Sequence, residues 1–494
     1  PQRRAPERNP AGDDLAAKSA VQLRQRLRSI RHDPQSEPVK PIRGNRRPCC
    51  HRHVIATSSA ALFIRLREDC GRGKSLGMID GPRLAPASGG QPKRGKQMLD
   101  AGIIENGAVA ITDGRIVAVG SSPDVLNSFT SGNTIDAEGK VACPGFVDPH
   151  THIVYAGDRL NEFELKIKGA DYLEILAGGG GIISTVQHTR VAGSDELMAS
   201  GTKRLDNMLA CGTTTCEIKT GYGLDIETEL KMLAVIASLD RSHSIDIVPT
   251  FLAAHTVPPE YKERSDEYVS LICDQMLPIA WKWFEQSNFP EKGRSFYCDV
   301  FTEEKAFDVT QSRRILEAAK TLGFGVKAHV DQFTNLGGSR LAIEMNAASI
   351  DHLDTISDEE ILLLASSETV GIFIPTENFN AGKTGFAPAR KLIDSGCAVA
   401  ISTDYNPGSA PCPSQQMAMT IASRYQKLLP SELFATATIN AACAIGEGAR
   451  VGSLEIGKDA DVLIFDSKDY REIIYEFGGP PSVTVIKGGQ VVYD

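Results

Sequence analysis

The sequence places His150 and His152 two positions apart, at the end of an apolar run that begins near Val141. In an extended strand, residues i and i+2 point to the same side, so both imidazoles can reach one metal ion. Imidazole nitrogen is a common ligand of zinc and iron. Because a His-x-His pair also arises by chance, it predicts a metal site only when further ligands lie elsewhere in the chain.

Three more residues meet that requirement, because each lies at or just after the C-terminal end of an expected strand. They are His329, His352 and Asp404, with strands expected at 325–329, 348–352 and 398–402. In a parallel barrel these strand ends meet at one face, where active sites are built. Imidazoles together with one carboxylate suit Zn²⁺ or iron. The ordered set predicts a metal-dependent active site, although a lone histidine in any of these places is more often structural.

The region that carries these residues, about 146–450, alternates expected strands with expected helices. Apolar residues recur at helical spacing over 195–210, 226–239 and 309–322, and Ser357 and Glu360 form a capping box. Further strands are expected at 213–218, 245–252 and 370–374, and further helices near 337–347, 387–395, 414–428 and 431–445. These repeated units predict an α/β fold, a (β/α)8 TIM-like barrel. A doubly wound sheet is the alternative, but no glycine fingerprint follows a first strand.

Segments rich in β structure flank this region. Asp113-Gly114 separates two alternating apolar runs, which indicates a hairpin, and the strands near 483–493 contain a Gly-Gly turn. We expect both flanks to form one small β-sandwich domain, with 76–145 as its first part and 451–494 as its second. Residues 1–75 carry 17 basic and 7 acidic residues and are expected to form a basic, disordered extension.

Composition excludes several classes of function. Hydrophobic residues make up 41% of the 494, which is typical of a globular chain. Beyond the basic extension, 36 basic and 55 acidic residues argue against nucleic-acid binding. No apolar stretch approaches 18 residues, so we expect no membrane partner. Eleven scattered cysteines without a CxxC pair are typical of free thiols in a reducing compartment, so we expect a cytoplasmic protein.

Longer motifs around the candidate ligands resemble the amidohydrolase superfamily. The run Pro144-Gly-Phe-Val-Asp-Pro-His-Thr-His152 is similar to its opening motif, and the flanking β segments resemble its small sandwich domain. Within that superfamily, four motifs resemble the imidazolonepropionase family: Ala156-Gly-Asp-Arg159, Glu217-Ile-Lys-Thr-Gly-Tyr-Gly-Leu-Asp225, Ala253-Ala-His255 and Ser402-Thr-Asp-Tyr-Asn-Pro-Gly-Ser409. The resemblance covers about residues 100–494.

This resemblance implies an activity and a set of roles. It implies that His150, His152, His329 and Asp404 bind one Zn²⁺ or Fe³⁺ per subunit. The implied reaction is the hydrolytic ring opening of 4-imidazolone-5-propanoate to N-formimino-L-glutamate in histidine degradation. Asp404 would take a proton from the attacking water and pass it to the leaving ring nitrogen, while His352 would polarise the carbonyl. The family also suggests a homodimer.

The propanoate of this small-molecule substrate requires a cation. Arg159, seven residues past His152, matches the family's substrate arginine and can bind a carboxylate through two hydrogen bonds. Other substrate contacts of the family match Tyr222, His255, Asn406, Gly408 and Ser409.

Position 332 departs from the family pattern. Related deaminases, and part of this family, have a His-x-x-Glu spacing, whereas this chain has His329-Val-Asp-Gln332. A glutamine orients a ligand by hydrogen bonds but cannot transfer a proton. We therefore expect Gln332 to act in the catalytic centre by binding substrate, with proton transfer by Asp404 and His352. Asp331 could substitute only after a backbone shift.

Three alternatives remain open at this point. One is a metal-dependent aminohydrolase, such as a guanine or cytosine deaminase, against which Gln332 counts. Another is a metal-free scaffold protein, against which the intact ligand positions count. The third is a binuclear site with a carbamylated lysine, for which Lys219 is the nearest candidate, although we prefer one metal.

Overall fold

The computed structural model describes residues 62–65, 78–79, 90–137, 139–169, 180–478 and 483–494. Most of the predicted basic extension, residues 1–61, lies outside the described residues. Within the described ranges, none of the helices combines the length and the apolar character needed to cross a membrane.

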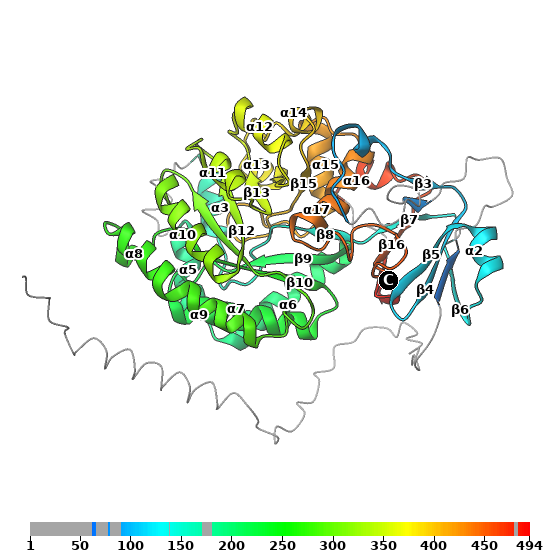
Figure 1. Cartoon of the computed structure of the whole chain (residues 1–494), viewed down its shortest axis with the longest axis horizontal. Helices are drawn as coiled ribbons and strands as arrows, with labels where there is room; N and C mark the ends of the chain where they lie inside the picture. The colour runs from blue at the N-terminus through cyan, green and yellow to red at the C-terminus, as the bar shows by residue number, and fades with distance from the viewer. Residues whose placement is uncertain (1–61, 66–77, 80–89, 138, 170–179, 479–482) are drawn as a thin grey trace, which may run out of the picture. The chain divides into compact units, whose positions relative to one another are not determined.

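Eight parallel strands form the barrel that carries the candidate residues (Figure 1). In sheet order they are β8 (Phe146–Asp148), β9 (Thr213–Lys219), β10 (Asp246–Ala254), β11 (Tyr297–Thr302), β12 (Gly325–Val330), β13 (Ser349–His352), β14 (Val370–Phe373) and β15 (Val399–Ile401). All eight are composed almost entirely of buried residues, as expected for strands covered on both faces. The predicted barrel is confirmed, and the doubly wound alternative is wrong.

A seam between the first and last strands closes the barrel. Thr151, after β8, forms a parallel bridge with Tyr405, after β15, and the N–H of His152 donates to the Tyr405 carbonyl at 3.0 Å. The hydroxyls of Ser402 and Thr403 each donate to the Asp148 carboxylate at 2.5 Å. The segment that carries His152 is therefore hydrogen-bonded to the one that carries Asp404.

Helices pack around the barrel strands (Figure 1). They agree best with the predicted helices where the helical spacing of apolar residues extends over several turns. The clearest matches are α6 (Ser194–Ala210), α7 (Ile226–Ser242) and α10 (Val309–Leu322). Helix α10 ends at Gly323, whose φ of +110° is readily adopted only by glycine. The capping box of Ser357 and Glu360 opens α12 (Asp358–Ala365). The other α-helices of the described residues are α2 (Ser122–Ser128), which packs on β4 (Gly107–Thr112) and β5 (Arg115–Ser121), and α3 (Leu160–Ile167), α5 (Ile182–Val191), α8 (Ser265–Leu271), α9 (Leu277–Gln286), α11 (Gly338–Glu344), α13 (Pro375–Asn380), α14 (Ala389–Asp394), α15 (Gln415–Tyr425), α16 (Pro430–Ala437), α17 (Ile439–Ala444) and α18 (Glu472–Tyr475).

Two four-stranded sheets form the flanking β domain. One sheet has the order β5-β4-β1-β6 and the other β18-β17-β16-β7. Their bounds are β1 (Leu62–Arg65), β4 (Gly107–Thr112), β5 (Arg115–Ser121), β6 (Asn133–Asp136), β7 (Val141–Pro144), β16 (Val462–Phe465), β17 (Val483–Lys487) and β18 (Gln490–Tyr493). Buried side chains from both sheets, including Ile111 and Ile464, belong to one hydrophobic cluster, so the predicted sandwich is confirmed. Asp113 and Gly114 both have positive φ, as a two-residue hairpin turn requires.

Three expectations differ from the structure. Strand β1 pairs with β4 and β6, so the first sheet begins inside the region predicted as an extension. The strand was missed because it is only four residues long and lies in a segment rich in basic residues. Strand β11 was not predicted, because its apolar run is interrupted by the buried Asp299. The helix expected over 431–445 is divided into α16 and α17 at Thr438, whose ψ of −97° is not helical.

Candidate active site

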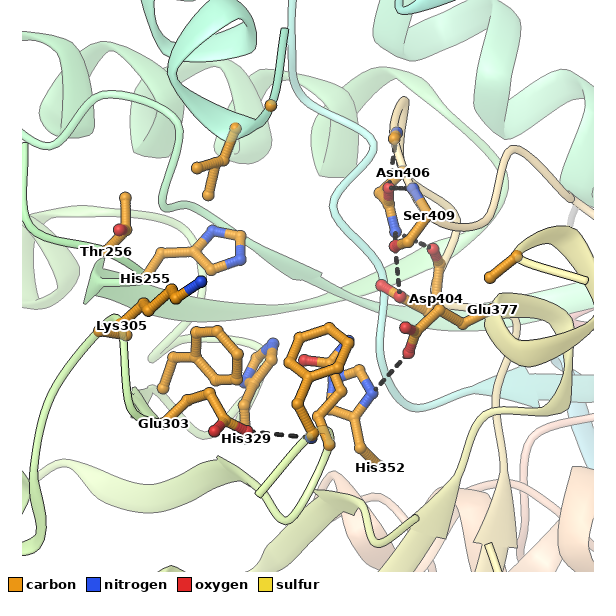
Figure 2. Close-up of a pocket in the computed structure, with 18 of the residues that line it drawn as sticks. His255, Thr256, Glu303, Lys305, His329, His352, Glu377, Asp404, Asn406 and Ser409 are labelled. Carbon is orange, nitrogen blue, oxygen red and sulfur yellow. Dashed lines mark hydrogen bonds and ion pairs between the residues drawn. The ribbon is translucent and has the colours of Figure 1, made fainter. Parts of the chain in front are cut away.

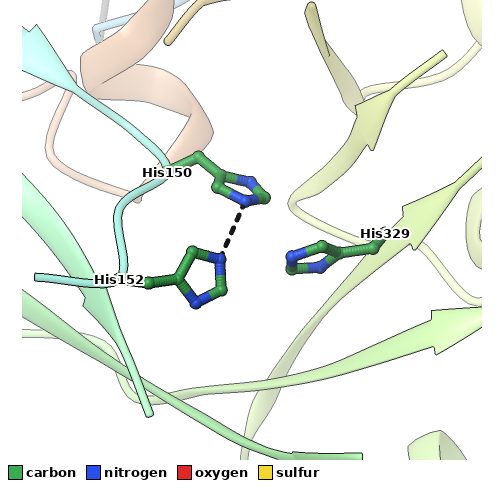
Figure 3. A group of neighbouring side chains, drawn as sticks. All are labelled: His150, His152 and His329. Carbon is green, nitrogen blue, oxygen red and sulfur yellow. Dashed lines mark hydrogen bonds between the residues drawn. The ribbon is translucent and has the colours of Figure 1, made fainter. Parts of the chain in front are cut away.

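Three histidines meet at the C-terminal end of the barrel (Figure 3). His150 and His152 lie in the extended segment after β8, and His329 is the penultimate residue of β12. The Nε2 atoms of His150 and His152 are 3.2 Å apart, and one nitrogen from each of the three rings lies within 4.8 Å of the others. The predicted pair thus faces one point, although it follows its strand rather than lying in it.

Asp404 brings a carboxylate to the same point. Its Oδ1 lies 3.6 Å from the Nε2 atoms of both His150 and His152. The residue follows β15 with a φ of +49°, a left-handed conformation that is uncommon outside glycine. Burial raises the pKa of Asp404 to about 7, and a cation beside the carboxylate would lower it again.

The chemistry of this donor set fits a metal ion. Burial is the main reason that the pKa values of His150, His152 and His329 lie well below the ordinary range, so the rings are neutral, the form that binds metals. The His329 Nε2 is buried and has no hydrogen-bond partner among the described residues. A buried nitrogen without a partner is costly, and a bound cation would satisfy it.

Aspartates beneath the cluster lie beside two of the histidines. The Nδ1 of His150 is hydrogen-bonded to Asp351 Oδ2 at 2.7 Å, whereas the Nδ1 of His329 lies 3.1 Å from Asp299 Oδ2 without hydrogen-bond geometry. The bond at His150 fixes that ring so that Nε2 points toward the metal position. Lys219 joins the two aspartates, with its Nζ 2.6 Å from Asp299 and 3.3 Å from Asp351.

These groups belong to a buried charged cluster, called here the floor network: Glu217, Lys219, Asp299, Lys327 and Asp351. Glu217 joins the two lysines, at 3.0 Å from Lys219 and 2.9 Å from Lys327. Burial would lower the pKa of Lys219, but the surrounding carboxylates, Asp299 first, raise it above the ordinary value. Its amine is therefore occupied by ion pairs with these carboxylates, and one metal per subunit stays a prediction.

A pocket of about 590 Å³ opens above the histidines (Figure 2). The predicted residues that line it are Arg159, Tyr222, His255, Gln332, Asn406, Gly408 and Ser409, together with His152, His329, His352 and Asp404. All the predicted site residues except His150 line this pocket. His150 belongs to the histidine cluster but is not among the lining residues.

Arg159 is held at the pocket edge by Glu162. Its Nε and Nη2 each lie 2.6 Å from a carboxylate oxygen of Glu162, which also accepts the Gly181 N–H at 2.8 Å. A Cβ at Gly408 would lie 2.2 Å from the Arg159 Nη1, so a side chain at position 408 would displace the guanidinium. The ion pair leaves Nη1 as the part of the guanidinium available to a substrate carboxylate.

Aromatic rings form the pocket wall beside His152. The His255 ring stacks on that of His152, with centroids 4.9 Å apart, and Tyr222 lies 5.5 Å from His255. The His255 Nδ1 lies 3.1 Å from the Gly221 carbonyl and donates to it. Burial lowers the pKa of His255 to about 4, so its ring is neutral and its Nε2 is an acceptor.

Asn406 shapes the loop after β15. Its amide donates to the Asp404 carbonyl at 2.7 Å and to Ser409 Oγ at 2.8 Å. Its Oδ1 accepts the N–H groups of Gly408 and Ser409, both at 2.8 Å. The Ser409 hydroxyl lies 3.3 Å from the Asp404 carboxylate and donates to it. Asn406 therefore holds the loop, and Ser409 supports the aspartate.

His352 lies at the pocket beside a glutamate that the sequence did not predict. Its Nδ1 lies 3.1 Å from Glu377 Oε2, and the Gln332 side chain is also hydrogen-bonded to Glu377. Burial would lower the pKa of His352, but the bond to Glu377 raises it above its ordinary value. Asp331 accepts a hydrogen bond from Ser339 at 2.5 Å and does not line the pocket, so it does not replace a glutamate at 332.

Comparisons with known proteins agree with this geometry. The amidohydrolase family model matches residues 141–492. An imidazolonepropionase of Chloroflexus aggregans is 51% identical to this chain over 81% of it and 94% of the relative. One from Herpetosiphon aurantiacus is 50% identical over 81% and 93%. The chain belongs to the imidazolonepropionase family.

Its membership of the imidazolonepropionase family and the histidine cluster together support a metal cofactor. Among solved structures, E. coli guanine deaminase has a TM-score of 0.61 and covers 89% of this chain and 100% of its own, at 15% identity. That likeness shows the shared fold alone.

Some residues of this imidazolonepropionase-family site were missed by sequence reasoning. Asp299 and Asp351 lie in barrel strands, and Glu162 and Glu377 lie on helices. The strands do carry a signal, because Glu217-Ile-Lys219 and Lys327-Ala-His329 alternate charged or polar residues with apolar ones inside fully buried strands. Charges at alternate positions of such strands indicate a polar barrel interior. The two helical glutamates have no comparable signal.

Proposed function

We propose that this protein is a hydrolase of cyclic amides that opens the ring of 4-imidazolone-5-propanoate to give N-formimino-L-glutamate in histidine degradation. The observation that carries the proposal is that Arg159 lines the same pocket as His152, His329 and Asp404 of the histidine and aspartate cluster. Relatives named imidazolonepropionase, at 50% and 51% identity over most of their length, support it.

We further propose that one Zn²⁺ or Fe³⁺ per subunit is held by His150, His152, His329 and Asp404. When bound, such an ion lowers the pKa of a water toward about 7 and polarises a carbonyl group. The neutral state of the three rings and the unpartnered Nε2 of His329 support this ligand set.

The pocket residues would hold the substrate in one orientation. The Nη1 edge of Arg159 would bind the propanoate, and Tyr222 and His255 would pack against the heterocycle. Gln332 would hydrogen-bond the ring through its amide, and the loop shaped by Asn406 would present Gly408 and Ser409.

Two residues would move or hold the protons. Asp404 would accept a proton from the attacking water and deliver it to the ring nitrogen as the bond from carbonyl carbon to nitrogen breaks. The protonated form of His352, which Glu377 favours by raising its pKa, would donate a hydrogen bond from Nε2 to the carbonyl oxygen while that oxygen gains negative charge. The water oxygen thus ends on the carbonyl carbon, one of its protons ends on the formimino nitrogen, and the other is released to solvent as the new carboxylic acid ionises.

The test follows the ultraviolet absorbance of 4-imidazolone-5-propanoate, prepared in situ, with metal-loaded and chelated protein side by side. We expect loss of absorbance only with the metal-loaded protein. No turnover by fully metallated protein would contradict the proposal. Ammonia release from guanine or cytosine would then identify the aminohydrolase alternative.

We also propose a cytoplasmic homodimer. The dimer follows from the family resemblance, and the compartment follows from free, buried thiols such as Cys143, Cys216 and Cys298. Light scattering after gel filtration should give twice the chain mass of 53.2 kDa. A peak of monomer mass would contradict the dimer.

A further inference from the structure

We propose that Glu377 is a positioning residue for His352, and that Glu377 and Gln332 together take the place of the glutamate found at position 332 in the His-x-x-Glu pattern. This inference rests on the proposed function, because it assigns His352 to the carbonyl oxygen of the substrate. The carboxylate is thus supplied from the end of β14 instead of the end of β12.

The geometry of His352 carries the first step. Glu377 lies in α13, directly after β14, and its side chain is 4% exposed. Its Oε2 is 3.1 Å from the His352 Nδ1. Figure 2 marks this contact with a dashed line. A carboxylate only accepts hydrogen bonds, so this contact places a proton on Nδ1. The opposite nitrogen, Nε2, is buried without a hydrogen-bond partner among the described residues. Glu377 therefore turns Nε2 toward the pocket that His352 lines.

The backbone at His352 makes such a partner necessary. Regular alternation along β13 would put the side chain of His352 on the opposite face from Asp351, yet its ring centroid lies 5.4 Å from that of His150 and 5.2 Å from that of His329. His352 and Leu353 have φ values of +86° and +68°, so the strand breaks at this point. The ring is therefore not oriented by regular strand geometry, and the bond to Glu377 is the contact that orients it.

Gln332 is matched to Glu377 in charge and in hydrogen bonding. Because Glu377 accepts only, the bond between the two side chains uses the amide N–H of Gln332. The Gln332 Oε1 then remains for a substrate N–H. A glutamate at 332 would add a second carboxylate to the pocket that Glu377 also lines, and like charges disfavour ionisation. The glutamine at 332 adds no such charge near Glu377.

The competing explanation is that Glu377 only stabilises the fold. Lys383 Nζ lies 3.5 Å from Glu377 Oε1, and its side chain is 32% exposed. If Glu377 served this ion pair alone, removing either partner would have the same effect. If it positions His352, removing Lys383 would leave the Nδ1 contact in place.

The test compares zinc-loaded Glu377→Gln, His352→Ala and the double variant on 4-imidazolone-5-propanoate. We expect Glu377→Gln to lower kcat by about 10–100-fold, with KM within about threefold of the wild type. Because Glu377 acts through His352, adding Glu377→Gln to His352→Ala should change kcat by less than about twofold. A Glu377→Gln enzyme with wild-type kcat, or losses that multiply in the double variant, would overturn the proposal.

Matched variants separate positioning from folding. Glu368→Gln removes a carboxylate that is 90% exposed and should leave kcat unchanged. Lys383→Met should keep kcat within about twofold, and a loss as large as that of Glu377→Gln would show a structural ion pair instead. If Glu377→Gln does not fold by circular dichroism, Glu377→Asp retains the charge. We expect Glu377→Asp to keep a measurable part of kcat, and a complete loss in the folded Asp variant would overturn the proposal.

Nitrogen-15 NMR of the histidine rings in the zinc protein, without substrate, separates this inference from the proposed function. We expect a proton on the His352 Nδ1 in the wild type and a shifted Nδ1–H signal in Glu377→Gln. A wild-type Nδ1 without a proton would overturn the positioning role even if turnover is normal. The Nδ1–H signal in an enzyme that does not turn over the imidazolone would support the contact and contradict the proposed function.

Discussion

Charged side chains below the histidine cluster and those around the pocket above it are arranged in opposite ways. The five members of the floor network have no exposed surface, and their ion pairs are with one another or with His150 and His329. Above the cluster, Arg159 and Glu377 each have a fixed partner and still line the pocket.

The difference separates two uses of charge in one site. A buried charge that loses its partner is strongly destabilising, so the floor network affects the stability of the whole fold. A group that lines an open pocket regains water when its partner is removed, so its loss affects substrate more than folding. The histidines lie between the two regions and depend on the lower one for orientation and on the upper one for substrate.

The largest effect is expected at the boundary between the two regions. His329→Ala removes a proposed metal ligand. Loss of a supporting partner alone usually costs 10–100-fold in metal affinity or activity, so we expect at least about a 100-fold loss of metal affinity and no measurable turnover. Metal content by mass spectrometry and the absorbance assay check this. His188→Ala, on an exposed histidine of α5, is the control and should keep the metal. A fully metallated, active His329→Ala protein would remove His329 from the ligand set.

A substitution in the floor network tests its share of the stability. Lys219→Met leaves three carboxylates without their shared cation, so we expect the free energy of unfolding to fall by about 3–5 kcal/mol. Thermal and urea denaturation measure the change. Lys168→Met, in an ion pair whose side chains are 68% and 71% exposed, should cost less than about 1 kcal/mol. Equal stability of the two variants would contradict the view that the floor network stabilises the fold more than an exposed ion pair does.

A substitution in the pocket should affect substrate with little change in folding. Arg159→Ala removes a charged hydrogen bond to the propanoate, worth about 1.5–3 kcal/mol, so KM should rise by about 10–100-fold. Arg264→Ala is the control, because Arg264 and its partner Glu267 are both exposed, and it should leave KM unchanged. Unchanged steady-state kinetics for Arg159→Ala would take Arg159 out of the substrate site.

The smallest effect is expected from a segment that belongs to neither region. Deletion of residues 1–56 leaves β1 (Leu62–Arg65) in place and should change kcat by less than about twofold and stability by less than about 0.5 kcal/mol. Deletion of 1–75 also removes β1 from between β4 and β6 and should lower the melting temperature. A loss of folding after the shorter deletion would show that these residues are structural.

The sequence predicted those features that local spacing determines. The two-residue hairpin followed from Asp113-Gly114, and the convergence of the candidate residues followed from polar residues at the ends of apolar strands, such as His329 and Asp404. The barrel was predicted because segments with the apolar pattern of a strand alternate regularly with segments that have the apolar period of a helix.

Contacts between distant segments could not be predicted in this way. The bond of His150 to Asp351 joins residues 201 positions apart, and the register of strands five apart in the sheet decides it. The position of Glu377 depends on a six-residue helix that begins at Pro375 and has no apolar period. Strand β1 pairs with β4 and β6, which lie more than 40 and about 70 positions further along the chain, and its four residues are too few to show a period.

The barrel seam has a consequence for the order of events during synthesis. Asp148 and Thr403 are 255 positions apart, and the segments they join bring His150 and His152 to Asp404. The complete ligand set therefore exists only after the last barrel strand has been made and has docked against the first. A nascent chain still lacking β15 presents histidines without their aspartate, so tight metal uptake reports that the ring has closed.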